Sequence, residues 1–135
     1  MDGIDRKILD TLKKDSRTPF LRIARTINVS EGTVRQRVKR FLSKGIIKKF
    51  TIQATNETTA LIQIETTSKT PTKKISLAII SAGARTVYEV TGDTTIIAFV
   101  SAENMAKLNE IIEKIRALVG VTKTKTFPIL REYGE

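Results

Sequence analysis

Residues 30–40 hold the densest group of side chains that could bind a nucleic acid. This segment combines hydroxyl, amide and guanidinium groups: Ser30, Gly32, Thr33, Arg35, Gln36, Arg37, Lys39 and Arg40. Arginine and lysine bind phosphate oxygens, and arginine, glutamine, serine and threonine also donate to or accept from base edges. After Glu31 the sequence has no acidic residue until Glu57, whereas a merely solvated helix face more often alternates acids with bases. The pattern favours binding to double-stranded DNA.

A second candidate site is the Gly-Asp pair at positions 92 and 93, between two apolar, β-prone runs. A hairpin turn alone would explain this pair. A small binding loop would explain it too, because glycine lets a ligand approach the backbone closely. The residues that we expect to bind an effector lie in this loop and on the last strand: Val90, Thr91, Gly92, Asp93, Thr94, Thr95, Thr124 and Thr126. The alternative for the threonines is ordinary β-propensity.

The composition argues against catalysis. The chain has 135 residues, no cysteine and no histidine, so it lacks a thiolate, a disulfide and the commonest general base. We therefore expect no enzyme, no catalytic residue and no metal site, although carboxylate chemistry is not excluded. The opening MDGIDRKILD is charged rather than signal-like, and no apolar run approaches the roughly 18 residues of a membrane span. We expect a soluble, cytoplasmic protein with no membrane partner.

The net charge of +10 is unevenly distributed. Residues 1–50 contain 14 Lys and Arg against five Asp and Glu, a net charge of +9, whereas residues 51–135 contain ten against nine, a net charge of +1. This asymmetry indicates one basic module joined to a neutral one. We expect a DNA-binding domain over residues 1–50, a linker over 51–58 and a second, neutral domain over 59–135.

Three amphipathic helices are predicted in the first module, over residues 4–14, 20–27 and 30–45. Ser30 and Glu31 suit a helix start, and Gly45 suits a helix end. Val34, Val38, Phe41 and Leu42 form the predicted buried stripe of the third helix, with Arg37 at its edge. Three short helices also occur in ordinary small bundles, but the basic outward face favours a helix-turn-helix.

Roles in DNA binding follow from residue type. Four small or amide residues are expected to approach base edges: Ser30, Gly32, Thr33 and Gln36. Four cations are expected to divide between bases and phosphates: Arg35, Arg37, Lys39 and Arg40. Backbone contacts are expected from Arg22 and Arg25, and from Lys48 and Lys49 on a strand-like wing, IIKKFTIQ, at residues 46–53. Simple solvation is the alternative for each arginine.

The second module alternates strands and helices. Strands are predicted over residues 60–68, 85–92, 94–101 and 121–132, and helices over 71–83 and 102–120. The apolar stripe of the first predicted helix includes Ile75, Leu77 and Ile79. That of the second includes Met105, Leu108 and Ile112. The order β-α-β-β-α-β predicts a ferredoxin-like α+β domain. Its helix-free sheet face carries enough Ile, Val and Phe to favour dimerisation through the sheets.

The chain resembles the Lrp/AsnC, or feast/famine, family of transcription regulators over nearly its whole length. DGIDRKILDTLKKDSRTPFLRIARTINVSEGTVRQRVKRFLSKGIIKKF is similar to the family's helix-turn-helix, and VYEVTGD and GVTKTKTFPIL are similar to two hallmarks of its effector domain. The resemblance implies dimers built on the α+β domains, a homo-oligomer that commonly reaches an octamer, and an amino acid effector bound where neighbouring dimers meet.

The sequence departs from the family pattern in three ways. Thr94 and Thr95 replace a frequent aromatic residue and a second acid, which leaves Asp93 and backbone carbonyls to hold an effector's ammonium group. The segment between the two halves is shorter than usual. Tyr88 and Phe127 are the only aromatic residues near the expected pocket, so a small polar or aliphatic effector is favoured over a bulky aromatic one.

The leading hypothesis is a sequence-specific DNA-binding regulator whose assembly or operator binding responds to an amino acid. One alternative is an architectural DNA protein that ignores small molecules. The other is an amino-acid-binding regulatory or enzymatic domain whose basic helices bind RNA or nothing.

Overall fold

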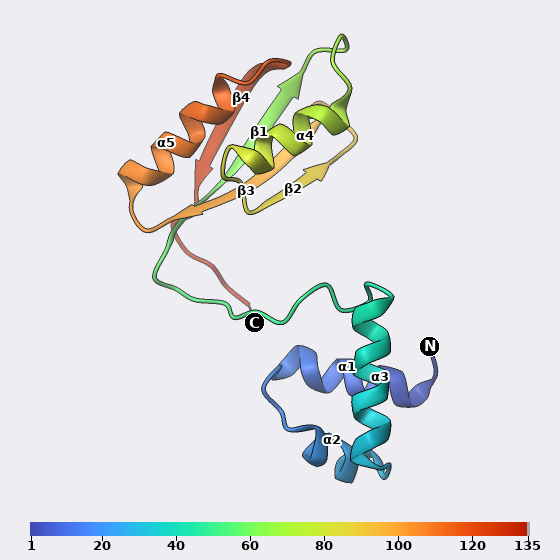
Figure 1. The fold of residues 1–135 in the computed structure, drawn as a ribbon. Coiled ribbons are helices and arrows are strands. Elements are labelled where there is room, and N and C mark those ends of the chain that lie inside the picture. The colour runs from blue at the N-terminus through green and yellow to red at the C-terminus, as the bar shows by residue number, and fades with distance from the viewer. Residues whose placement is uncertain (135) are drawn as a thin grey trace. The chain divides into compact units, whose positions relative to one another are not determined.

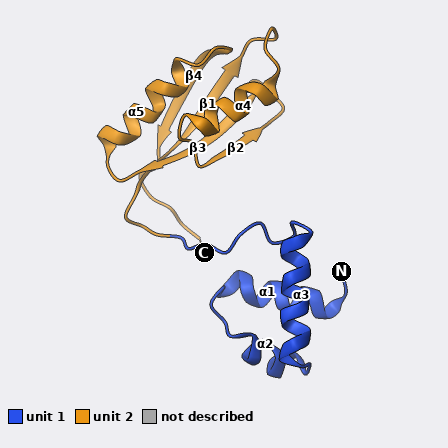
Figure 2. Cartoon of the chain, in the orientation of Figure 1, with its two compact units in different colours: residues 1–53 blue, residues 54–135 orange. Residues whose placement is uncertain are grey.

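The computed structural model describes residues 1–134. The chain divides into two compact units, residues 1–53 and residues 54–135 (Figure 2). Each unit has its own hydrophobic core, and the two cores share no residue. The units are therefore described one at a time.

Three helices make up the first unit: α1 (Gly3–Lys14), α2 (Phe20–Ile27) and α3 (Glu31–Ser43) (Figure 1). Asp2 and Asp5 form a capping box at the start of α1, and the Ser30 hydroxyl accepts a hydrogen bond from the Thr33 amide at the start of α3. Such caps satisfy amides that have no partner inside the helix. The core centres on Phe41, surrounded by apolar residues of all three helices: Ile8, Leu9, Leu12, Ile23, Ala24, Val34 and Val38.

Two expectations for this unit are wrong. The structure has no strand over residues 46–53, so the predicted wing is not formed as a strand; the amides of Ile46 and Ile47 instead donate to the Phe41 carbonyl oxygen. A strand needs a hydrogen-bonding neighbour, and residues 1–53 of the structure supply none. Leu42, expected in the buried stripe, is 44 % exposed because Phe41 fills the core position at the end of α3.

The second unit contains β1 (Thr58–Thr66), α4 (Thr72–Ser81), β2 (Thr86–Glu89), β3 (Ile96–Ala102), α5 (Met105–Arg116) and β4 (Val121–Pro128). The strands form one antiparallel sheet in the order β2-β3-β1-β4, and both helices cover the same face of it (Figure 1). The α+β class and the ferredoxin-like order of elements are confirmed.

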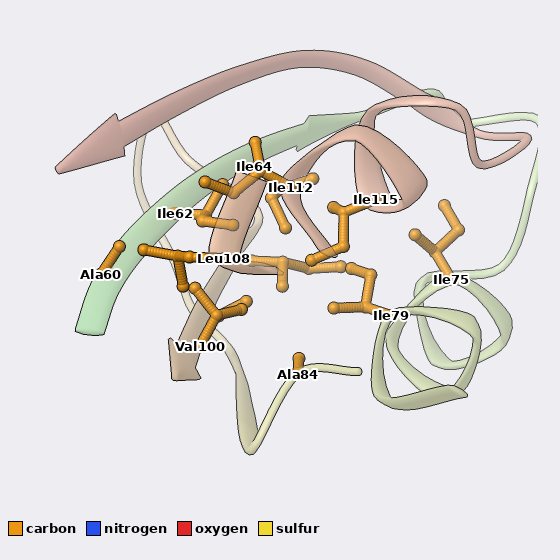
Figure 3. Close-up of a cluster of buried hydrophobic side chains, with 12 residues drawn as sticks. Ala60, Ile62, Ile64, Ile75, Ile79, Ala84, Val100, Leu108, Ile112 and Ile115 are labelled. Carbon is orange, nitrogen blue, oxygen red and sulfur yellow. The ribbon is translucent and has the colours of Figure 1, made fainter. Parts of the chain in front are cut away.

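The core of this unit lies between the sheet and the two helices (Figure 3). Ile62 and Ile64 of β1 meet Ile79 of α4 and Leu108 of α5, all four fully buried. Leu77 and Met105 were expected in the helical stripes, but they are 59 % and 55 % exposed. Since each residue advances about 100° around a helix, Leu77 lies roughly opposite the buried Ile75 and Ile79.

The helix-free face of the sheet changes from apolar to charged along the strands. Strand pairing places Phe99, Leu61 and Phe127 in one row across β3, β1 and β4. Four positions further along β1, Glu65 lies opposite Lys123 of β4. We call this surface, defined by Leu61, Gln63, Glu65, Ile97, Phe99, Lys123, Lys125 and Phe127, the bare face.

None of the helices described in residues 1–134 is both long enough and apolar enough to cross a membrane.

Candidate functional site

The solvent-facing stripe of α3 carries half of the residues that we expected to read DNA. Gly32, Arg35, Gln36 and Lys39 are all exposed and recur at spacings of three and four, so they lie on one side of the helix. We call these four residues the reading stripe. Their combination of a small residue, an amide and two cations can enter a major groove and hydrogen-bond there.

Ser30 and Thr33 lie together at the start of α3. The Ser30 hydroxyl accepts from the Thr33 amide at 3.1 Å, and the two hydroxyl oxygens are 2.8 Å apart. Both side chains therefore serve the helix cap, which leaves part of their hydrogen-bonding capacity for a ligand.

Arg35 is the first cation of the reading stripe. It forms an ion pair with Glu31 one turn earlier, and its guanidinium lies 5.6 Å from the centre of the Phe20 ring. The side chain remains exposed at 66 %, so this ion pair is screened by water and is weak. Arg35 can exchange Glu31 for a nucleic-acid phosphate.

Arg37 and Arg40 lie on a different side of α3 and bind acids of α1. Arg37 Nη1 donates to Asp2 Oδ2 at 2.6 Å and to Asp5 Oδ1 at 2.8 Å. Arg40 Nη2 donates to the two Asp5 oxygens at 2.7 and 2.8 Å. We call these four residues the acid clamp. We expected both arginines to contact DNA, and the sequence analysis did not find these acids. The one signal in the sequence was that the two acids and the two arginines are each separated by three residues.

The clamp shifts the pKa of its members. The Asp5 amide and the Arg37 guanidinium donate to the Asp2 carboxylate and lower its pKa. Burial opposes ionisation of Asp5, yet hydrogen bonds from the Asp2 amide and Arg37 outweigh burial and lower the Asp5 pKa. The pKa of Arg37 is raised by its hydrogen bonds to Asp2 and Asp5. All three groups are therefore charged at neutral pH. With the Arg40 guanidinium, which pairs with Asp5, the two acids and two bases of the clamp sum to zero charge.

An open hollow of about 360 Å³ adjoins the clamp. It is lined by Met1, Asp2, Asp5, Arg37, Arg40, Lys44 and Ile46.

The remaining cations expected to bind DNA are exposed. Arg22 and Arg25 lie on α2, and Lys48 and Lys49 follow α3 in a segment without strand structure. Within residues 1–134, none of these four nor Lys39 is within ion-pair distance of a carboxylate. Their charges are free to meet phosphates.

In the second unit, residues 90–95 connect β2 to β3 in a hydrogen-bonded turn. The Val90 amide donates to the Thr95 carbonyl oxygen at 2.9 Å, and the Thr95 amide donates to the Ile64 carbonyl oxygen of β1 at 3.3 Å. Gly92 has a φ of +127°, which other residues rarely adopt, and the space where a side chain would project is open. The turn is thus anchored to the sheet while Gly92 and the exposed Asp93 leave room beside the backbone.

A small cavity of about 50 Å³ brings two of the expected effector residues together. Thr94 and Thr124 line it with Gln63, Glu65, Lys123 and Lys125. Ile64 of β1 brings Thr94 and Thr124 together. Its carbonyl oxygen accepts from the Thr95 amide of the turn, and it lies opposite Thr124 in the β1–β4 ladder. Thr126 lies two positions further along β4, opposite Ile62. The cavity is not lined by Thr126 or by the other expected effector residues, which are Val90, Thr91, Gly92, Asp93 and Thr95.

Four lining residues were not foreseen from the sequence: Gln63, Glu65, Lys123 and Lys125. Glu65 brings a carboxylate and the lysines bring ammonium groups, so the cavity could meet both ends of a zwitterion. Knowledge of the β1–β4 register would have found them, but periodicity alone does not give register.

Comparison with known proteins agrees with these features. Residues 1–42 match the AsnC-type helix-turn-helix domain, and residues 59–135 match the Lrp/AsnC ligand binding domain. The HTH-type transcriptional regulator LysM of Saccharolobus solfataricus is 40% identical over 136 residues, which cover 98% of this chain and 96% of that protein.

Solved structures share the fold. Escherichia coli AsnC superimposes with a TM-score of 0.74 at 25% identity, covering 98% of this chain and 93% of AsnC. A transcriptional regulator of Neisseria meningitidis, solved as a complex with L-methionine, gives a TM-score of 0.79 at 15% identity, covering 100% of this chain and 93% of that one.

A helix-turn-helix domain followed by a ligand-binding α+β domain defines a DNA-binding transcriptional regulator that also binds a small molecule. The chain belongs to the Lrp/AsnC family of such regulators. Its relatives are named as transcriptional regulators, so it is classed with them and not with enzymes.

Proposed function

We propose that this protein binds specific DNA sequences as a dimer or larger homo-oligomer and that an amino acid bound between effector domains changes its assembly or its operator binding. The observation that carries the proposal is the pairing of two unlike surfaces in one chain. An exposed reading stripe with two cations lies in one unit, and a small polar cavity lined by Glu65, Lys123 and Lys125 lies in the other.

DNA affinity in this proposal comes from the exposed cations. Lys39, Lys48, Lys49, Arg22 and Arg25 neutralise phosphates, and each neutralised phosphate releases counterions, so affinity falls steeply as salt rises. Gln36 and Arg35 read base edges, with Gly32 allowing close approach and Ser30 and Thr33 near the entering end of the helix. A dimer presents two reading stripes to half-sites about 34 Å apart.

The bare face is the proposed dimer surface. Phe99, Leu61 and Phe127 form an apolar row that no element within residues 54–134 covers, and α4 and α5 pack on the opposite face. A second copy of the same face would bury these side chains, and closed two-fold assemblies are the commonest kind of oligomer.

The effector site is proposed at the cavity and the adjoining turn. The carboxylate of Glu65, with that of Asp93 next to the lining residue Thr94, would hold an ammonium group, while Lys123 and Lys125 would hold a carboxylate. Thr94 and Thr124 would bind a small polar side chain or leave space for an aliphatic one. A volume of about 50 Å³ holds only part of an amino acid, so a neighbouring subunit would complete the site. Such completion would couple binding to assembly, and the complex of the Neisseria meningitidis regulator with L-methionine supports an amino acid as the ligand class.

The test is a titration of the full-length protein with each of the twenty amino acids. Binding is measured by equilibrium dialysis, particle mass by light scattering, and affinity for a DNA site selected from random duplexes by anisotropy. We expect at least one amino acid to bind and to change mass or affinity. An amino acid that binds and changes neither would refute the regulatory coupling.

Thr124→Val is expected to weaken that amino acid's binding, because the variant removes a cavity hydroxyl without changing side-chain size. Thr86→Val is the matched control, since Thr86 lies on β2 and does not line the cavity. Equal binding by both variants would place the effector elsewhere. Equal affinity for selected and random duplexes, with no amino acid bound, would favour an architectural DNA protein instead.

A further inference from the structure

The acid clamp divides the cations of α3 into two groups. Lys39 and Arg35 project into solvent on the reading stripe, whereas Arg37 has a side chain only 24% exposed and contacts two carboxylates. Positions 33, 37 and 40, with the C-cap at 44, form a second line along the helix, about a third of a turn from the reading stripe. The clamp and the reading stripe are therefore distinct sides of the same helix.

We propose that Arg37 is a positioning residue of the recognition helix and not a DNA contact. With Asp2 and Asp5 it fixes the rotation of α3 about its own axis, so that Gln36 and Lys39 point outward. The inference rests on the proposed DNA-binding function, and it assigns the specificity of that function in part to two acids on α1.

The geometry makes the clamp hard to open. Asp2 and Asp5 are themselves held by the capping box, in which each backbone amide donates to the other's carboxylate, at 3.0 and 2.8 Å. Asp5 is 1% exposed, so its charge needs the guanidinium groups that surround it. A DNA phosphate would have to displace Arg37 from two carboxylates that cannot follow it.

Arg40 supports the same arrangement through its bonds to both Asp5 oxygens. The two arginines are three residues apart and reach α1 from successive turns of α3. A rotation of α3 that brought Arg37 toward DNA would break both sets of hydrogen bonds. The clamp therefore resists the motion that would misalign the reading stripe.

The experiment compares salt dependence with sequence preference. The double variant Asp2→Asn/Arg37→Gln removes one acid and one base, which leaves the net charge unchanged; asparagine is also as good a helix cap as aspartate. Lys39→Gln is the matched control, because Lys39 lies two residues away, is exposed and has no ion-pair partner among residues 1–134. Full-length proteins, with folding checked by circular dichroism, are titrated with a random-sequence duplex and a selected duplex across a range of salt concentrations.

We expect Asp2→Asn/Arg37→Gln to keep the wild-type salt slope on random duplex while its preference for the selected duplex falls by roughly fivefold or more, because misplaced base contacts lose discrimination. Lys39→Gln should flatten the slope by about 0.9 per lost phosphate contact. Arg37→Lys should behave like the double variant, since a lysine keeps the charge but lacks the planar fork.

Two results would overturn the inference. A slope reduced as far as in Lys39→Gln would show that Arg37 neutralises a phosphate. An unchanged slope with an unchanged preference would show that Arg37 positions nothing. Failure of the wild type itself to bind either duplex is a different outcome, which refutes the proposed function before any variant is compared.

Discussion

Gly92 and Gly120 share a left-handed backbone conformation but differ in what surrounds them. Gly92, in the candidate effector turn, has a φ of +127° and open space beside it. Gly120, between α5 and β4, has a φ of +95°, and an added Cβ would lie 2.7 Å from Cδ1 of Ile75 in the core. Backbone conformation is the constraint at position 92, and both conformation and packing are constraints at position 120.

This difference predicts unequal costs for the same substitution. Gly92→Ala should lower the free energy of unfolding by about 1–2 kcal/mol through backbone strain alone. Gly120→Ala should add overpacking of about 1–3 kcal/mol to a similar strain. Urea denaturation monitored by the circular dichroism of the β-sheet measures both free energies. Equal losses of stability in the two variants would contradict the packing argument.

The acid clamp predicts a pH dependence for the first unit. Asp2 and Asp5 have pKa values lowered from 3.8 in the folded protein, so the stability that they contribute is present above about pH 3.8 and is lost as pH falls through the lowered values. Arg37 has a raised pKa and stays protonated throughout this range.

The measurement is urea unfolding of the helical signal between pH 6 and pH 2. Asp2→Asn should reduce the loss of stability on acidification. Asp10→Asn, also on α1 but outside every ion pair within residues 1–134, should leave it as in the wild type. The same loss of stability on acidification in both variants would show that Asp2 does not contribute to the pH dependence.

Helix α3 is the element on which both the core of the first unit and the reading stripe depend. Phe41 is fully buried among the three helices, whereas its neighbour Leu42 is almost half exposed. The predicted stripe treated the two alike because both fall near the apolar side of the helical wheel. Only packing against α1 and α2 distinguishes them.

Phe41→Ala should therefore cost the first unit about 3–5 kcal/mol, because the cavity that it leaves cannot collapse fully. Leu42→Ala should cost roughly 0.5 kcal/mol, as at other surface positions. Urea unfolding monitored by the helical circular dichroism signal compares the stability of the two variants. Comparable losses would mean that Leu42 is buried after all.

Elements with strong periodicity could be predicted from the sequence, and so could their order. The α+β class, the three N-terminal helices and the β-α-β-β-α-β sequence follow from apolar spacing and glycine positions. The absence of a wing strand could not be predicted, because residues 46–53 have strand-like composition but no partner strand in their unit. The acid clamp was missed because its members are 32 and 35 residues apart, a distance that periodicity does not reach.

The candidate effector site shows the same limit. Its turn was found from Gly92 and Asp93, and Thr94 and Thr124 do meet. Glu65 and Lys123 were not found, because they join the cavity only through the register of β1 against β4. Residue type locates a turn in the sequence, and strand pairing decides what lies beside it.

For the whole molecule, the apolar row on the bare face predicts the assembly state. Leu61→Asp places a charge in the middle of that row and should convert the proposed dimer or larger oligomer to smaller species with weaker DNA binding, since two linked reading stripes bind more tightly than one. Leu77→Asp is the control, because Leu77 is more exposed but lies on the outer side of α4. Sedimentation velocity gives the mass, and a wild-type mass for Leu61→Asp would contradict dimerisation through the bare face.

The two separate cores also affect how heat should be absorbed when the chain unfolds. Because the cores have no residue in common, a calorimetric scan can contain two transitions, and a single melting temperature would then describe neither unit. A ligand raises the transition of the unit that binds it. An amino acid that moved the transition of the helical unit as well would give a direct reading, in degrees, of the free energy that links sensing to DNA binding.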